Sequence, residues 1–279
     1  MASHPLSRRA LREWSVLVLA LLLVASVWTF VELAEEVVEG DTHRFDETLL
    51  LAMRNPADRS DPIGPGWVEE IGRDFTALGG IAVLVMIVLA TSGYLVLSRK
   101  ARAALWLMLA TGSGMALSSL LKMGFDRPRP DLVPHGTIVY TASFPSSHSM
   151  MSAVVYLTIG ALLARVQPRR RLKVYILSLA ILLTLVVGIS RVYLGVHWPT
   201  DVLAGWSLGT AWALTSWLVM GWLQDRRQVE PPDGDNTRFI SVGPARGWPG
   251  VFVNVNRGKR SVVLDLRSDA GKVALRKLV

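Results

Sequence analysis

Six long apolar segments constrain this chain of 279 residues more than any other feature of its sequence. They lie at residues 14–34, 77–97, 103–121, 147–164, 172–189 and 202–223, and each is close to the length of about 20 residues with which a helix crosses a bilayer. Hydrophobic residues make up 51% of the chain, which is typical of a membrane protein when they are gathered in such runs. The sequence therefore predicts an all-α polytopic membrane protein with six transmembrane helices in a bundle. The first segment is expected to be a retained span rather than a cleaved signal peptide.

Basic residues beside these segments predict their orientation, because short cytoplasmic loops carry an excess of lysine and arginine. If all six segments cross, four basic clusters fall on one side: Arg8, Arg9 and Arg12; Arg99, Lys100 and Arg102; Arg165, Arg169, Arg170, Arg171 and Lys173; Arg226 and Arg227. Both termini are then cytoplasmic, and the loops 35–76, 122–146 and 190–201 face the outside, the periplasm if this is a bacterial inner membrane. These clusters account for much of the net charge of +8, so we expect a membrane partner and no nucleic acid. The chain has no cysteine, which excludes a thiol nucleophile and a cysteine metal site.

The third outer loop, SRVYLGVHWPTD at residues 190–201, offers three reactive side chains in a row. Arg191 can hold a phosphate in a bidentate fork, and a neutral His197 can attack phosphorus. Asp201 can hold the other ring nitrogen of the histidine and stabilise positive charge as it forms. Trp198 is interpreted as an anchor at the membrane interface.

The second outer loop begins with a cationic stretch, KMGFDRPRP. Its prolines exclude a regular helix, so Lys122, Arg127 and Arg129 are expected in an ordered loop outside the third span. Basic residues are disfavoured on the outer side, and an anionic ligand would explain them. The alternative is that Lys122 and Arg127 only mark the interface, and Arg127 either touches a substrate or positions the loop.

The same loop ends with FPSSHSM at the start of the fourth span. Ser146 is placed to cap the helix, and the hydroxyl of Ser146 or the amide groups of Ser147 and His148 can bind an anion there. His148 then stands beside that anion, placed to protonate a departing oxygen. The alternative is a simple helix cap followed by an interfacial histidine. His135, farther back in the loop, is expected to be a surface residue.

These three stretches follow the pattern K-x6-RP, PS-x-H and SR-x5-H-x3-D, which resembles the type 2 phosphatidic acid phosphatase family, relatives of the vanadium haloperoxidases and bacterial acid phosphatases. The resemblance covers roughly residues 1–223. It departs from the family in one place, where Ser147 replaces the usual glycine. The resemblance implies that His197 is the nucleophile that forms a phosphohistidine, that Asp201 orients it, and that His148 protonates the leaving oxygen and later activates water.

The resemblance also implies a phosphate site made by Lys122, Arg129, Ser146 and Arg191, with Ser147 beside them. Fixed cations can supply the charge neutralisation that other phosphoryl-transfer enzymes obtain from magnesium. The outer loops contain no carboxylate cluster of metal-ligand type, so we expect a metal-independent reaction without a cofactor.

The expected substrate is a lipid phosphate or lipid diphosphate, such as undecaprenyl diphosphate, phosphatidic acid or phosphatidylglycerol phosphate. Two alternatives use the same anion pocket. One is a vanadate-dependent haloperoxidase. The other is a protein that binds or transports lipid phosphates without turnover, for which Ser147 would be a sign of lost catalysis.

The first outer loop carries a weaker pattern. Phe45, Leu49, Leu50 and Met53 recur at helical spacing, which indicates either a short amphipathic helix on the membrane surface or a solvated connector. Prolines and glycines at residues 62–66 end any such helix before the second span.

The composition changes at the end of the sixth span. We divide the chain into a membrane phosphatase domain, residues 1–224, and a short mixed or disordered cytoplasmic tail, residues 225–279. The tail contains a strand-like SVVLDL followed by a helical pattern, and it resembles part of the N-terminal region of the class III CoA-transferases. It lacks the region where that family carries its catalytic aspartate, so no CoA-transferase activity is implied. We interpret the tail as an incomplete fragment, left by a gene fusion or a mis-joined reading frame.

Overall fold

The computed structural model describes residues 5–135 and 141–225, together with residues 229–230, 262–263, 268–269 and 273. The helices are α1 (Pro5–Glu39), α2 (His43–Leu51), α3 (Gly66–Leu78), α4 (Ile81–Leu97), α5 (Ala101–Gly124), α6 (Ser147–Val166), α7 (Arg170–Tyr193) and α8 (Pro199–Asp225). Strand β1 (Arg54–Asn55) pairs antiparallel with β2 (Asp58–Pro62), and β3 (Val229–Glu230) pairs in parallel with β4 (Val262–Val263). The chain forms two compact units, Met1–Trp217 and Leu218–Val279.

Most of the predicted membrane spans are present as helices. Among the described residues, five helices are long and apolar enough to cross a membrane: α1 from Val16 onward, α5, α6, α7, and α8 as far as Trp222. A sixth span arises if α3 and α4 are counted together, with a bend of 50° between them. The predicted all-α membrane fold is confirmed, with the second span as a broken one.

The break in the second span has a local cause. The segment predicted at residues 77–97 is not one helix, because α3 ends before Gly79 and α4 begins after Gly80. A Cβ at Gly79 would overlap Cγ1 of Val187, so the break packs against α7 at a distance that only glycine allows. The predicted second span is therefore wrong in its first residues.

The first outer loop is more ordered than a connector. The predicted short helix is confirmed as α2, but its buried face is Asp46 and Leu50, while Phe45 and Leu49 are exposed. The glycine and proline run does end the preceding structure, yet α3 starts within it at Gly66. The β1–β2 hairpin between these helices was not predicted.

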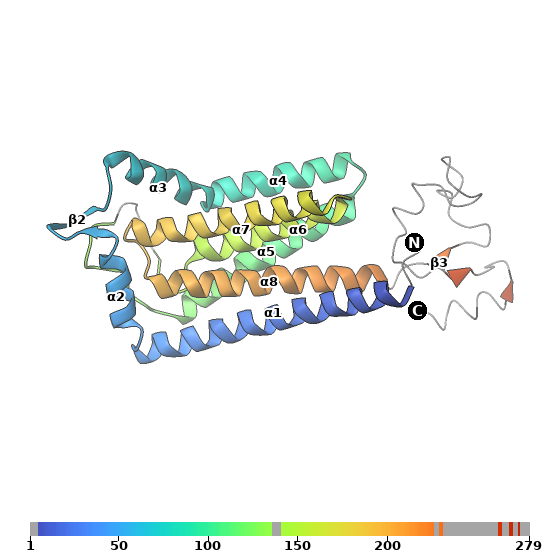
Figure 1. The fold of residues 1–279 in the computed structure, drawn as a ribbon, viewed down its shortest axis with the longest axis horizontal. Coiled ribbons are helices and arrows are strands. Elements are labelled where there is room, and N and C mark those ends of the chain that lie inside the picture. The colour runs from blue at the N-terminus through green and yellow to red at the C-terminus, as the bar shows by residue number, and fades with distance from the viewer. Residues whose placement is uncertain are drawn as a thin grey trace. The chain divides into compact units, whose positions relative to one another are not determined.

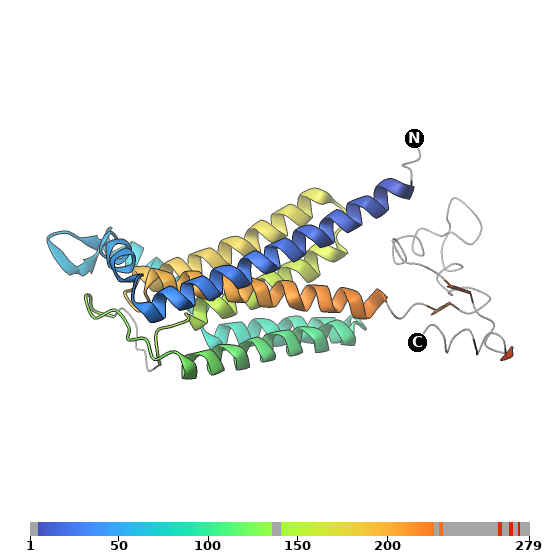
Figure 2. The same ribbon diagram turned by 90° about the horizontal axis from the view of Figure 1, so that it is seen from below.

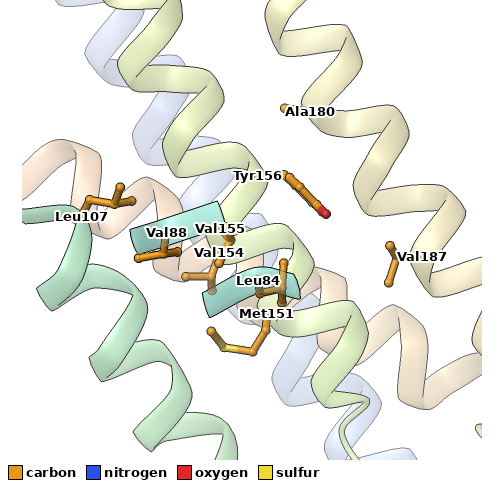
Figure 3. Close-up of a cluster of buried hydrophobic side chains, with 9 residues drawn as sticks. All are labelled: Leu84, Val88, Leu107, Met151, Val154, Val155, Tyr156, Ala180 and Val187. Atoms are coloured by element: carbon orange, nitrogen blue, oxygen red, sulfur yellow. The ribbon is translucent and has the colours of Figure 1, made fainter. Parts of the chain in front are cut away.

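Helix α6 is the centre of the bundle. It packs against α4, α5 and α7, and its apolar residues Met151, Val154 and Val155 are buried between them. Figure 3 shows this core, to which the neighbouring helices contribute Leu84, Val88, Leu107, Ala180 and Val187. Tyr156, which belongs to this core, donates its hydroxyl to the Leu78 carbonyl at 2.8 Å, so the end of α3 is tied to α6.

One end of the first unit gathers the polar loops. The ends of α5 and α7 and the starts of α6 and α8 lie at the same end as α2 and the β1–β2 hairpin (Figures 1 and 2). The connection from α5 to α6 contains no helix or strand in its described part, as its prolines predicted. The three polar stretches of the sequence therefore meet at one end of the bundle.

Of the predicted tail, only short pieces belong to the described residues. Strand β4 lies within the predicted SVVLDL. Of the helical pattern after it, only residues 268–269 and 273 are described, and Asp269 and Val273 are helical; the rest of that prediction lies outside the described residues.

Candidate active site

The centre of the polar end is a histidine paired with an aspartate. His197 lies in the connection between α7 and α8, and Asp201 lies in the first turn of α8. Nδ1 of His197 is 3.3 Å from Oδ2 of Asp201, and Nη1 of Arg129 is 3.2 Å from Nε2. A guanidinium can only donate hydrogen bonds, so Nε2 must accept and a neutral ring carries its proton on Nδ1, which donates to Asp201. This tautomer leaves a lone pair on Nε2.

Burial keeps this imidazole neutral. His197 is 1% exposed, and removal from water lowers the pKa of its ring below the ordinary 6.5, a shift that the Asp201 carboxylate opposes only in part. Arg191 and Arg129 lower it further by charge repulsion. A neutral His197 at neutral pH has the lone pair that nucleophilic attack requires.

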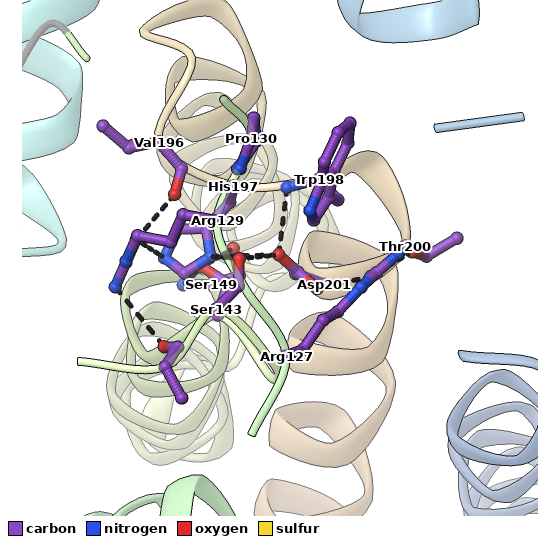
Figure 4. A network of polar contacts seen from close by, with 12 residues as sticks. Arg127, Arg129, Pro130, Ser143, Ser149, Val196, His197, Trp198, Thr200 and Asp201 are labelled. Atoms are coloured by element: carbon purple, nitrogen blue, oxygen red, sulfur yellow. Dashed lines mark hydrogen bonds and ion pairs between the residues drawn. The ribbon is translucent and has the colours of Figure 1, made fainter. Parts of the chain in front are cut away.

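Asp201 is fully buried and accepts several hydrogen bonds (Figure 4). Its Oδ2 accepts from the Ser143 hydroxyl and from the Trp198 amide at 2.9 Å, and its Oδ1 accepts from Arg127 at 2.7 Å. These contacts fix the carboxylate in the orientation that holds His197. Ser143 was not singled out in the sequence, because a lone serine in a loop carries no distinctive signal.

Arg129 faces the lone pair of His197 and is held by backbone carbonyls. It donates to the Val196 carbonyl at 2.6 Å and to the Thr141 carbonyl at 2.8 Å. Burial lowers the pKa of Arg129, yet an arginine remains charged at neutral pH. The guanidinium is thus fixed beside Nε2 of His197.

Two further predicted cations approach the same centre. Lys122, in the last turn of α5, donates to the Ala142 carbonyl at 2.6 Å. Arg191, in the last turn of α7, is 3% exposed and donates to the Thr76 hydroxyl at 2.8 Å. Its Nε is buried with no hydrogen-bond partner among the described residues. An unpartnered buried guanidinium nitrogen is costly, and an anionic ligand would satisfy it.

His148, in the first turn of α6, is partly buried. It lies within electrostatic range of Lys122, Arg129, Arg191 and His197. The second predicted histidine is therefore brought to the same centre as the first. No hydrogen bond joins the two histidines among the described residues.

The two serines before His148 are used differently. Ser146 is fully buried and caps α6: its Oγ accepts from the Ser149 amide at 3.5 Å and from the Ser149 hydroxyl at 3.0 Å. The Ser146 amide donates to the Asp201 carbonyl at 3.0 Å, which joins the starts of α6 and α8. The Ser147 hydroxyl lies 2.9 Å from the Ser118 hydroxyl of α5. The side chain that replaces the family's glycine therefore contacts α5.

Three other expectations are decided by the contacts. Arg127 positions the loop, since it pairs with Asp46 and Asp201 at 2.6 and 2.7 Å. Trp198 is not an interface anchor: it is 5% exposed, and its ring nitrogen donates to the Pro128 carbonyl at 3.0 Å. His135 contacts the Pro130 carbonyl at 2.7 Å and belongs to the loop.

The sequence predicts a site without metal ligands at this end of the bundle. In the part of the chain that the structure describes, no three histidine, aspartate or glutamate side chains are grouped so that they could hold a metal ion. Metal independence of the reaction stays a prediction.

Comparison with known proteins shows which family the chain matches. The family model described as PAP2 superfamily matches residues 103–225. The chain is 38% identical over 148 residues to phosphatidylglycerophosphatase B of Bacillus subtilis, a match that covers 51% of this chain and 70% of the relative. It is 34% identical over 104 residues to undecaprenyl-diphosphatase of Sulfolobus acidocaldarius, which covers 37% of this chain and 45% of that relative.

A solved structure agrees in fold. The crystal structure of a transmembrane PAP2 type phosphatidylglycerolphosphate phosphatase from Bacillus subtilis aligns with a TM-score of 0.63 and 31% identity. The alignment covers 74% of this chain and 97% of that one. Helices that span a membrane and a buried histidine–aspartate pair among cations define an integral membrane hydrolase of phosphoric esters. The chain belongs to the PAP2 superfamily, which confirms the family predicted from the three motifs.

The tail matches a different family. The model described as CoA-transferase family III matches residues 228–279, which confirms the predicted resemblance. The division of the chain at residues 224 and 225 stays a prediction.

Proposed function

We propose that the chain hydrolyses a lipid phosphate or lipid diphosphate through a phosphohistidine on Nε2 of His197, without a metal ion. The single observation that carries this proposal is the position of the His197 ring between Arg129 and Asp201. Its Nε2 carries the lone pair that accepts from the Arg129 guanidinium, and its Nδ1–H is directed at Asp201. A nucleophile, a counter-ion for the positive ring and a phosphate-binding cation are then in contact in one place.

In the first step Nε2 of His197 attacks phosphorus, and the bond from phosphorus to the leaving oxygen breaks. The leaving oxygen takes the electron pair of that bond and a proton from His148, which gives the lipid alcohol or lipid monophosphate. Asp201 stabilises the positive charge that appears on the ring. Lys122 and Arg129 neutralise the phosphoryl oxygens as negative charge is redistributed over them.

In the second step water attacks the phosphohistidine. His148, now neutral, takes a proton from the water, and the bond between Nε2 and phosphorus breaks with its electron pair returning to the ring. Inorganic phosphate leaves and both histidines regain their starting states. The amide groups at the start of α6, which Ser146 caps, are placed for the same anion.

The proposed substrate class follows from the location of the site. A cluster of cations at one end of a membrane bundle suits a lipid whose chains remain in the bilayer while its headgroup reaches the cations. Phosphatidylglycerol phosphate is the first candidate, because the Bacillus subtilis relatives are named for it. We place the site on the outer face and both termini in the cytoplasm, from the basic clusters at the other ends of the spans.

The test is phosphate release by the purified full chain in detergent, with a panel of lipid monophosphates and diphosphates and with EDTA present. His197→Ala is expected to lower the rate at least about 1,000-fold, as removal of a catalytic nucleophile does. His135→Ala is the matched control, an exposed loop histidine beside the Pro130 carbonyl, and is expected to retain the rate. Activity that EDTA abolishes, or that survives His197→Ala, contradicts the proposal.

Two more measurements separate the alternatives. Halide oxidation by the vanadate-loaded protein would favour a haloperoxidase. Binding of lipid phosphates without release of phosphate would favour a binding or transport protein.

We further propose that residues 1–224 carry this activity. The tail matches the CoA-transferase family III model at residues 228–279, and we propose that a gene fusion or a mis-joined reading frame joined it to the membrane domain. Sequencing the transcript across residues 223–230 tests the join. A stop codon or frameshift there would show it to be false.

A further inference from the structure

Asp46, an acid outside the three motifs, lies directly behind the histidine–aspartate pair. It belongs to α2 and is fully buried. Its Oδ1 accepts from the Thr200 amide at 2.9 Å, and its Oδ2 accepts from the Thr200 hydroxyl at 2.7 Å and from Arg127 at 2.6 Å. A buried carboxylate with several donors is held firmly in one position. Its partner Thr200 immediately precedes Asp201 in the sequence.

Arg127 joins this carboxylate to the one at the active site. Its Nη2 donates to Asp46 and its Nη1 donates to Asp201, so a single guanidinium is shared by two buried carboxylates. The Nη2 atom also donates to the Thr42 hydroxyl at 3.1 Å, and the Trp198 ring covers the guanidinium at 5.7 Å. The planar fork of arginine suits such bridging, whereas a lysine presents a single point charge.

The charges of this group do not cancel. Two carboxylates and one guanidinium leave one negative charge next to a neutral His197. When the histidine ring becomes positive during phosphoryl transfer, the group of four becomes neutral. If Asp46 were uncharged, Arg127 would already neutralise Asp201, and the positive ring would have no net counter-ion in a site of low dielectric.

We propose that Asp46 is a positioning residue of the reaction: by sharing Arg127 it leaves the charge of Asp201 for His197 and holds that carboxylate in place. This inference rests on the proposed function of His197 and Asp201. Asp46 acts through Arg127 and Thr200 and does not touch the substrate. Helix α2 of the first outer loop thereby becomes part of the catalytic apparatus.

The experiment compares Asp46→Asn with Asp41→Asn in the full chain, by steady-state phosphate release in detergent. Asp41 is the matched control, an exposed acid just before α2 whose replacement removes the same charge. We expect Asp46→Asn to lower kcat about 10-fold to 100-fold, the range typical of partners behind a reactive group, with KM changed less than about 3-fold. Asp41→Asn should match the wild type in both. Asp46→Glu, which restores the charge, should recover part of kcat.

A double-mutant cycle shows whether Asp46 acts through Arg127. Arg127→Gln in the Asp46→Asn background removes the cation that would otherwise neutralise Asp201. The combined loss in kcat should therefore be much smaller than the product of the two single losses. Losses that multiply contradict the proposal.

The experiments distinguish failure of the proposed function from failure of the role proposed for Asp46. If the wild type releases no phosphate, or His197→Ala remains active, the proposed function fails. If wild type and His197→Ala behave as expected but Asp46→Asn keeps its kcat, or raises only KM, the role of Asp46 alone is overturned. If Asp46→Asn does not fold, Arg127→Lys decides the matter: it keeps the charge but cannot pair with both carboxylates in one fork, and an unchanged kcat overturns the role.

Discussion

A single methyl group added at Gly205 should test how tightly the active site depends on the packing of α8 against α6. A Cβ built at Gly205 lies 2.7 Å from the Ser146 carbonyl oxygen and 2.9 Å from Cβ of Ser149. Gly205 follows Asp201 by one helical turn, so both residues face the start of α6. The Ser146 amide donates to the Asp201 carbonyl at 3.0 Å across the same contact.

The size of the effect follows from these distances. An ordinary van der Waals contact of a Cβ begins at 3.4 Å, so the difference from 2.7 Å requires the two backbones to separate by about 0.7 Å. The Ser146 oxygen is backbone and cannot turn away as a flexible side chain would. We expect Gly205→Ala to destabilise the fold by about 1–3 kcal/mol, as overpacking does. Because Asp201 moves with α8, kcat should fall about 10-fold to 100-fold, the loss expected when a reacting group is misplaced by about 1 Å.

The assay pairs thermal unfolding in detergent with phosphate release, and Gly112→Ala is the matched control. Gly112 lies inside α5, and an added Cβ there meets no atom within 4 Å. Alanine favours a helix over glycine by about 1 kcal/mol, so this control should be neutral or slightly stabilising, with unchanged kcat. A Gly205→Ala variant with the Tm and kcat of the wild type would refute the reasoning, because the contact could then relax without moving Asp201.

Three further outcomes are expected from single residues of the site. Thr76→Val removes the hydroxyl that holds Arg191, and we expect KM for the lipid phosphate to rise about 3-fold to 10-fold with kcat nearly unchanged, measured by steady-state phosphate release. Ser147→Gly restores the family's glycine and loses the contact with Ser118, so thermal unfolding should show a loss of about 1 kcal/mol while kcat does not fall. Burial lowers the pKa of His197, so below about pH 6.5 the unfolded chain takes up a proton that the folded chain does not, and Tm should fall between about pH 7 and pH 5. His197→Asn should flatten that part of the pH profile, and an unchanged profile contradicts it.

The three motifs could be predicted from the sequence because their charged residues are unusual in the loops that carry them. Lys122, Arg129 and Arg191 are cations in segments predicted to lie on the side of the membrane where cations are disfavoured, and their spacing from His148 and His197 matches a family. Only the assignment of all three stretches to one side of the membrane was then needed to bring them together. The structure adds the distances.

Asp46 could not be predicted in the same way. It is one of 22 acidic residues, and it lies in a loop whose apolar pattern pointed to another helix face. The pattern was built on Phe45, Leu49, Leu50 and Met53. Leu50 is buried, yet Phe45 and Leu49 are exposed, and Asp46, one turn before Leu50, completes the buried face. A buried aspartate is recognised only by its partners, and Arg127 and Thr200 are distant from it in the sequence.

The bend between α3 and α4 has a signal in the sequence that the mean hydropathy of the segment does not reveal. Gly79 and Gly80 stand together at the start of the predicted second span, and adjacent glycines are a turn signal. The hydropathy of the segment hides them, because it averages over about 20 residues while a turn needs two. The consequence for the site is direct: α3 carries Thr76, which holds Arg191, at an angle that one straight helix would not allow.

The hydrogen-bond and ion-pair partners of each cation indicate whether that cation stabilises the fold or is available to bind a ligand. Arg127 is neutralised by two carboxylates and has no charge left for a substrate. Lys122, Arg129 and Arg191 donate only to carbonyl oxygens, a hydroxyl group or the imidazole ring among the described residues, and none of them forms an ion pair there. Three positive charges without carboxylates, Arg191 buried and Lys122 and Arg129 partly buried, are costly, because neutral oxygens replace only part of the hydration that is lost. Such a cluster is stabilised by an anion with several oxygens, and a phosphoryl group held against Nε2 of His197 would supply one.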